Sequence, residues 1–146
     1  MNKKESCVMI FVTPQSSCAR LIEAGSKIAA KEHKRAVIVS VIKENNQENI
    51  NALNDLYECV EKNHVDMNLY FNDDPYITSA VAAKRFNASV IITGFPGERG
   101  SGFIFSVHEL LPDIPIIMID YDNTEYKILP FKKSDVEKAK SSVNLE

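Results

Sequence analysis

The chain has 146 residues, 45% of them hydrophobic and 25% charged, which suits one domain with a proper core. Its formal net charge of -3, with no run of more than two basic residues, argues against a nucleic-acid partner. No apolar run approaches the roughly 20 residues of a membrane helix, MNKKES does not resemble a signal peptide, and three widely spaced cysteines favour reduced thiols in the cytoplasm.

Strand and helix patterns alternate from the start of the chain. Residues 7–13 are apolar throughout, which is typical of a strand covered on both faces. Apolar residues then repeat at helical spacing over 16–34, and we expect Ser16 or Ser17 to cap this helix. Residues 35–42 predict a second buried strand.

The same alternation continues through the middle of the chain. Residues 46–63 carry the clearest amphipathic helix, and 65–71 alternate apolar with polar residues, as in an edge strand with one wet face. Aspartates followed by Pro75 mark the start of a third helix, which extends to Phe86. Residues 88–93 predict a fourth buried strand.

The last third contains a short helix and a fifth strand. We expect the helix over 103–111 and the strand over 114–120. The alternation predicts an α/β domain over 1–120, with a parallel sheet and helices on both faces. The more polar residues 121–146 form a C-terminal extension, in which 126–129 favour an additional strand and a short helix follows.

Glycines cluster directly after the fourth predicted strand. Four of the five glycines lie within TGFPGERGSG, residues 93–102. Ligands of a doubly wound sheet bind beyond the carboxyl ends of its strands, where glycines let backbone amides approach an anion. Arg99 would pair with a phosphate, and Ser101 or Ser106 would donate hydroxyl hydrogen bonds. The alternative is a flexible connection in which Glu98 repels an anion.

Motifs for catalysis are missing from the sequence. There is no GxxxxGK[ST] loop, and no GxGxxG follows the first strand. The first strand ends in Thr13, so the acidic residues of a phosphoacceptor receiver domain are absent as well. We expect His33, His64 and His108 on the surface, and the histidines and cysteines show no metal-ligand spacing. We therefore predict neither catalytic residues nor a metal site.

The segments VTPQSSCARLIEAGSKIA and ASVIITGFPGERGSG resemble the universal stress protein family, and the resemblance covers nearly all of residues 7–120. It implies a Rossmann-like fold with a five-stranded parallel sheet in the order 3-2-1-4-5. The first segment is especially similar to the version found in bacterial potassium-sensing histidine kinases. The residues that carry this similarity are Thr13, Gln15, Cys18, Arg20, Leu21 and Ile22.

The ATP-binding branch of this family carries G-x-x-G, nine residues, and then G-[S/T]. Gly94 and Gly97 match the first pair, whereas Phe105 stands where a glycine would precede Ser106. Thr13 stands where this branch has an aspartate that contacts the nucleotide. The nucleotide contacts that the resemblance implies, for ATP or AMP, are Thr13, Val41, Gly94, Gly97, Arg99, Ser101 and Ser106.

The resemblance implies a cytoplasmic regulatory or stress-response module. It also implies a homodimer, with the exposed edge of the fifth strand, 114–120, and the C-terminal tail as the interface. Two alternatives remain: a protein-interaction domain that binds no nucleotide, and a weak ATP hydrolase assisted by His108 or Asp73. The hydrolase is the less favoured of the functions, and we expect no nucleic-acid or membrane partner.

Overall fold

A computed structural model of the protein describes residues 5–42, 46–94 and 101–129. The strands are β1 (Cys7–Phe11), β2 (Arg35–Ile42), β3 (Asp66–Phe71), β4 (Ala88–Gly94), β5 (Ile116–Ile119) and β6 (Glu125–Ile128). The helices are α1 (Ala19–Lys31), α2 (Gln47–Asn63), α3 (Pro75–Arg85) and α4 (Ser101–Leu110), and a 3-10 turn over Ser16–Cys18 precedes α1. The helix expected near residues 135–143 lies outside the described residues.

The sheet has six strands in the order β3-β2-β1-β4-β5-β6. The first five are parallel and follow the expected order 3-2-1-4-5, but β6 pairs antiparallel with β5, so the expectation of five parallel strands is wrong. The cause is a tight turn between β5 and β6. Asp120 N donates to Thr124 O at 3.0 Å, and Asn123 adopts a left-handed φ of 67°. A reversal this short allows only antiparallel pairing.

The strand β6 also changes which edge of the sheet is free. It pairs with β5 along its length, from Ile116 opposite Ile128 to Ile119 opposite Glu125. The exposed edge expected for residues 114–120 is therefore absent, because β5 is hydrogen-bonded to β4 on one side and to β6 on the other. The outer edges of the described sheet are β3 and β6.

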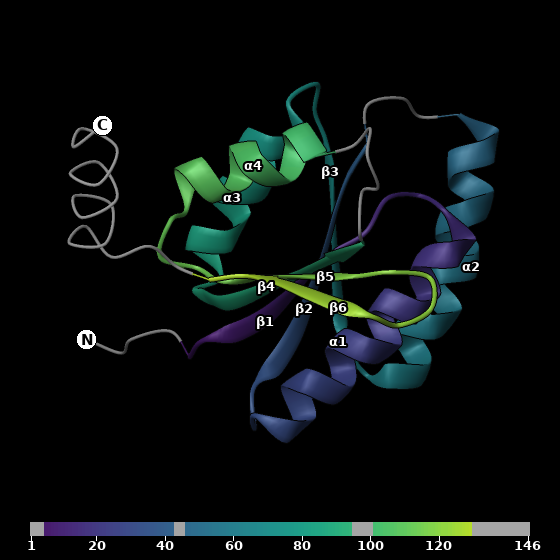
Figure 1. The fold of residues 1–146 in the computed structure, drawn as a ribbon. Helices are drawn as coiled ribbons and strands as arrows, with labels where there is room; N and C mark the ends of the chain where they lie inside the picture. The colour runs from purple at the N-terminus through teal and green to yellow at the C-terminus, as the bar shows by residue number, and fades with distance from the viewer. Residues whose placement is uncertain (1–4, 43–45, 95–100, 130–146) are drawn as a thin grey trace, which may run out of the picture.

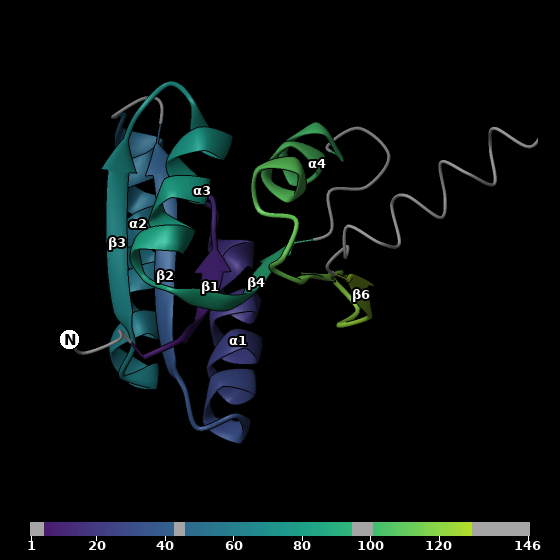
Figure 2. The same cartoon turned by 90° about the vertical axis from the view of Figure 1, so that its left-hand side faces the viewer.

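Helices cover both faces of the sheet. Figure 1 shows α3 and α4 above the sheet and α1 below it, and α2, at the right, packs with α1 in the same half of the core. Figure 2, turned by 90°, shows β3 and β6 at opposite ends of the sheet. This is the three-layer arrangement predicted from the alternation of strands and helices.

The central strand β1 divides the core into two halves. All five of its residues are buried. Val8 and Ile10 pack with residues of α1 and α2, whereas Cys7, Met9 and Phe11 pack with residues of α3 and α4. Successive side chains of a strand point to opposite faces, so a continuous apolar run supplies both layers of core at once.

The start of α1 differs from the expectation. The residue at its N-cap is Cys18, which makes no side-chain capping hydrogen bond, and neither Ser16 nor Ser17 holds that position. The 3-10 turn explains the difference, because Cys18 N donates to Gln15 O at 3.0 Å and is satisfied by backbone.

The three cysteines are free and buried. Burial is the main cause that raises the pKa of Cys7, and the nearby charges of Arg35 and Lys34 lower it in part. Burial likewise raises the pKa of Cys59, with a further increase from Glu23. Cys7 Sγ donates to Phe86 O at 3.3 Å, and Cys59 Sγ to Ala19 O at 3.6 Å. These contacts hold the protonated thiols, so neither is an activated nucleophile.

Gly25 sets how closely α1 approaches β1. A Cβ at this position would overlap with Cδ1 and Cγ1 of Ile10, which is fully buried. We expect Gly25→Ala to lower the free energy of unfolding by about 1 to 2 kcal/mol, because overpacking outweighs the better helix propensity of alanine. Urea unfolding measures the change.

Gly102, in α4, provides the matched control. An added Cβ there meets nothing within 4 Å, so Gly102→Ala should leave stability unchanged or raise it by up to about 1 kcal/mol. In an Ile10→Ala background the space is open, and Gly25→Ala should lose most of its cost. A Gly25→Ala variant as stable as Gly102→Ala would contradict the close approach.

The buried thiols predict a loss of stability in alkali. An unfolded cysteine ionises near pH 8.5, whereas the raised pKa values keep Cys7 and Cys59 protonated to higher pH. The stabilisation is fully present below about pH 8.5 and is lost as pH rises through the folded pKa values. Urea midpoints measured from pH 7 to pH 10 should fall less steeply in a Cys7→Ala, Cys59→Ala variant. An identical slope would contradict the assignment.

Candidate functional site

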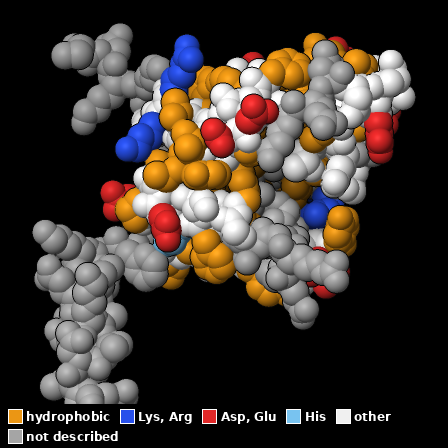
Figure 3. Space-filling model, turned by 90° about the horizontal axis from the view of Figure 1, so that it is seen from above, with side chains coloured by type: hydrophobic (Ala, Val, Ile, Leu, Met, Phe, Trp, Pro, Cys, Tyr) orange, Lys and Arg blue, Asp and Glu red, His pale blue; other side chains and the backbone are white. Residues whose placement is uncertain are grey.

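The candidate site lies at the carboxyl ends of β1, β2 and β4. Strand β1 lies between β2 and β4, so the chain moves outward from β1 in one direction and later returns to continue in the other. Ligands of open α/β sheets bind at this switch point. Figure 3 looks onto the molecule from above and shows hydrophobic side chains gathered in patches, with few Lys or Arg side chains among them.

A largely apolar cavity of about 340 Å³ opens here, within the size range of small-molecule sites. Its apolar wall consists of Phe11, Val12, Val39, Val41, Pro75 and Phe103. Three hydroxyl-bearing residues, Thr13, Ser79 and Thr93, complete the wall. Apolar surface with a few hydrogen-bonding groups suits a flat ring that carries polar atoms at its edge.

Packing between elements fixes the shape of this cavity. The rings of Phe11 on β1 and Phe103 on α4 meet edge to face, with centroids 6.1 Å apart and an interplanar angle of 67°. Pro75 and Ser79 are four residues apart on α3, so both lie on the helix face that meets the cavity. The cavity therefore lies between the α3–α4 layer and the ends of the strands.

A second, more polar cavity of about 430 Å³ adjoins the first and shares Phe11, Thr13 and Thr93 with it. The rest of its wall is Gln15, Ser17, Cys18, Arg20, Leu21, Gly94 and Tyr121. Thr13 Oγ1 lies 3.5 Å from Cys18 Sγ, which ties the end of β1 to the start of α1. Among the described residues of this wall, Arg20 is the one that carries a charge.

The end of β5 holds the guanidinium of Arg20 in place. Its Nη1 donates to Ile119 O at 2.8 Å and to Asp120 O at 3.1 Å, and its Cζ lies 4.6 Å from the ring centroid of Tyr121. Arg20 Nη2 lies close to Gly94: a Cβ added to this glycine would be 3.5 Å from Nη2. Arg20 Nε is buried and has no hydrogen-bond partner among the residues that the structure describes.

The structure brings together three of the seven expected contact residues. Thr13 and Val41 lie in the wall of the apolar cavity, and Gly94 lies with Thr13 in the wall of the polar one. Gly97 and Arg99 are outside the described residues, and Ser101 begins α4 but its side chain is not described. Ser106, on α4, is half-buried and belongs to neither wall.

His108 was expected on the surface, but the structure buries it. Its side chain is only 8% exposed, because it follows Ile104 by one helical turn and thus lies on the buried face of α4 with Val107. Neither His108 nor Asp73 lies in the wall of either cavity, so the two candidate groups for hydrolysis are absent from both.

Several wall residues were not predicted from the sequence. Phe11, Ser79 and Phe103 shape the apolar cavity, and Arg20 supplies the positive charge of the polar one. One signal pointed to Arg20: it stands in the first turn of the helix after β1, beside the switch point.

Comparison with known proteins gives matches at the level of structure. No family model and no curated protein matches the sequence. A universal stress protein family member from Burkholderia pseudomallei aligns at 17% identity and a TM-score of 0.58, covering 82% of this chain and 98% of its own. A universal stress protein in complex with cAMP aligns at 11% identity and a TM-score of 0.59, covering 82% of this chain and 99% of its own. A universal stress protein from Archaeoglobus fulgidus aligns at 13% identity and a TM-score of 0.60, covering 77% of this chain and 92% of its own.

The chain therefore has the α/β fold of universal stress proteins. The match includes nearly the whole length of each of these structures. Within the described part of the chain, no helix has the length and apolar character needed to cross a membrane.

Proposed function

We propose that the protein is a regulatory module of the universal stress protein type that binds an adenine nucleotide at the apolar cavity. One observation carries the proposal. A ring-sized apolar cavity with three hydroxyl-bearing residues opens at the switch point of the sheet, in a fold shared with a universal stress protein that holds cAMP. AMP, ATP and cAMP share the ring that would fill it.

The sequence resemblance to the version found in potassium-sensing histidine kinases supports the proposal. Five of the six residues that carry it lie in the wall of the polar cavity: Thr13, Gln15, Cys18, Arg20 and Leu21. The proposed module acts in the cytoplasm, where its three free cysteines would stay reduced.

Binding without hydrolysis is the better-supported activity. The described walls of both cavities contain neither a carboxylate nor a histidine, the groups that most often serve as a general base. A domain that binds only another protein would not need a ring-sized cavity at the switch point.

We further propose a homodimer through β6, whose outer edge is unpaired among the described strands. In a two-fold antiparallel pair centred on Tyr126, Glu125 of each copy stands opposite Lys127 of the other. Opposite charges in directly facing positions favour such pairing. The expected interface thus moves from β5 to β6.

The nucleotide site is tested by filling the apolar cavity. Val41→Phe should weaken binding of adenosine and AMP at least tenfold, because the added ring occupies the space of the ligand. Val81→Phe is the matched control, since Val81 is 60% exposed on α3 and lies in neither cavity wall. Isothermal titration calorimetry measures the affinity of both variants for adenosine and AMP, and thermal melting checks that the variants fold.

The proposal fails if no adenine compound binds the wild-type protein, which would favour the interaction domain. It also fails if Val41→Phe and Val81→Phe bind equally well. Release of ADP from bound ATP would instead favour the hydrolase.

The dimer is tested by reversing charge on β6. Lys127→Glu places a glutamate opposite Glu125 at both symmetry-related positions of the dimer. The repulsion should weaken dimerisation roughly tenfold. The swap Glu125→Lys, Lys127→Glu restores opposite charges and should restore the dimer. Light scattering across a concentration series measures all three proteins. A wild-type protein that stays monomeric at high concentration, or a swap as weak as the single variant, would overturn this interface.

A further inference from the structure

The guanidinium of Arg20 is held in a way that leaves one edge without a described hydrogen-bond partner. Both hydrogen bonds of Nη1 go to backbone carbonyls, those of Ile119 and Asp120. The remaining edge, formed by Nε–H and one N–H of Nη2, has no described partner, and Nε is buried. Two parallel N–H groups on one guanidinium edge match the two oxygens of a phosphate or carboxylate.

The structure shows no salt bridge between Arg20 and a described residue, although Glu23 and Glu125 line another cavity that Arg20 also borders. No acidic residue lies in the described wall of the polar cavity, and the ion pair found in the described chain joins Lys34 to Glu32 elsewhere. Carbonyl oxygens and the Tyr121 ring orient the guanidinium without neutralising it. A fixed cation that makes no salt bridge to a described residue, beside a cavity, favours an anionic ligand group.

The two cavities adjoin at Phe11, Thr13 and Thr93, so one ligand can reach both. We propose that Arg20 is the anion-binding residue of the site and takes the phosphate of a ligand whose ring fills the apolar cavity. The identity of the ring rests on the proposed function, whereas the anion site rests on Arg20 itself. In this arrangement Arg20, which lies on α1 and is oriented by the carbonyl groups at the end of β5, binds the phosphate.

A calorimetric comparison of AMP with adenosine isolates the contribution of the phosphate. The wild-type protein should bind AMP about tenfold or more tightly than adenosine, as expected for a hydrogen-bonded pair of charged groups. Arg20→Gln should remove that difference, because AMP affinity falls much more than adenosine affinity. Arg20→Lys keeps the charge but loses the two-pronged edge, so it should keep only part of the difference.

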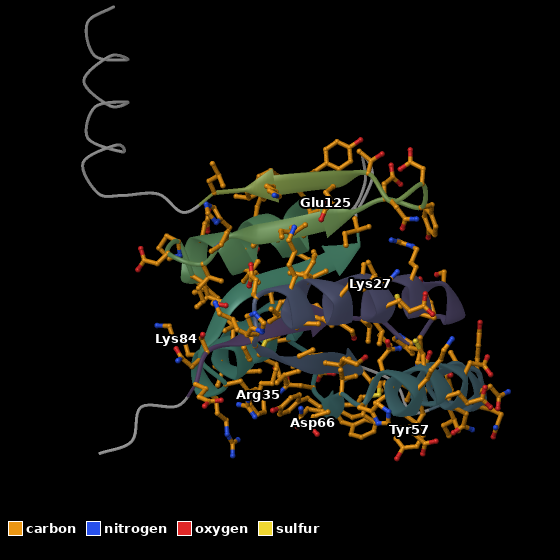
Figure 4. The ribbon with its side chains drawn as sticks, turned by 90° about the horizontal axis from the view of Figure 1, so that it is seen from below. Lys27, Arg35, Tyr57, Asp66, Lys84 and Glu125 are labelled. Carbon is orange, nitrogen blue, oxygen red and sulfur yellow. The ribbon has the colours of Figure 1, made fainter. Side chains whose placement is uncertain are left out.

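Lys27→Gln is the matched control for charge. Lys27 lies on the same helix, two turns further on, and is not in the wall of the polar cavity; it borders another cavity, which Arg20 and Glu125 also line. Figure 4 labels both residues in the view from below. This variant should keep the full AMP preference. An equal loss of adenosine and AMP binding in Arg20→Gln would mean that Arg20 only holds α1 to β5, and would overturn the proposal.

Nuclear magnetic resonance of the arginine Nε–H groups tests the anion site without the ring. Inorganic pyrophosphate and AMP should both move the Arg20 Nε–H signal, assigned by its loss in Arg20→Lys, and adenosine should not. If pyrophosphate moves the signal but no adenine compound binds, the anion site stands and the proposed function fails. If adenosine binds in a Val41-dependent way but neither anion moves the signal, the proposed function stands and the anion site fails.

Discussion

Because β1 is buried at all five positions, a helical layer has to cover each of its faces. The chain meets this requirement by building β2 and β3 on one side of β1 and β4 and β5 on the other. The connections therefore diverge at the carboxyl end of β1, and the two adjoining cavities lie there. The position of the candidate site is thus a consequence of burying the first strand on both faces.

The close approach of α1 to β1 extends this constraint to the polar cavity. Gly25 lets the helix lie directly on Ile10, and that placement brings the first turn of α1 to the ends of β4 and β5. Arg20 reaches Ile119 O and Asp120 O from there. A side chain at position 25 would push the helix outward and lengthen these contacts, so packing in the core and geometry at the site are linked through one helix.

The regular part of the fold could be predicted from the sequence because its signals are local. Continuous apolar runs marked β1 and β2, and residues at helical spacing marked α2. Other features depend on contacts between distant residues. Arg20 and Ile119 are 99 residues apart, and no local pattern announces their hydrogen bond. An additional strand was expected over 126–129, but its antiparallel pairing with β5 depends on the left-handed turn at Asn123, which no local pattern announces.

On the proposed function, the segment from Ile119 to Glu125 connects two surfaces of the module. Its first residues hold Arg20 at the ligand site, and its last residue begins the edge strand β6. The backbone between them is fixed locally: hydrogen bonds from Thr124 to Asp122 lower the pKa of that exposed carboxyl, and Asp120 N donates to Thr124 O at 3.0 Å. A ligand that binds the guanidinium of Arg20 therefore binds a group that is hydrogen-bonded to the carbonyls of Ile119 and Asp120, just before the turn into β6. On this proposal, one tight turn separates the ligand surface from the partner surface.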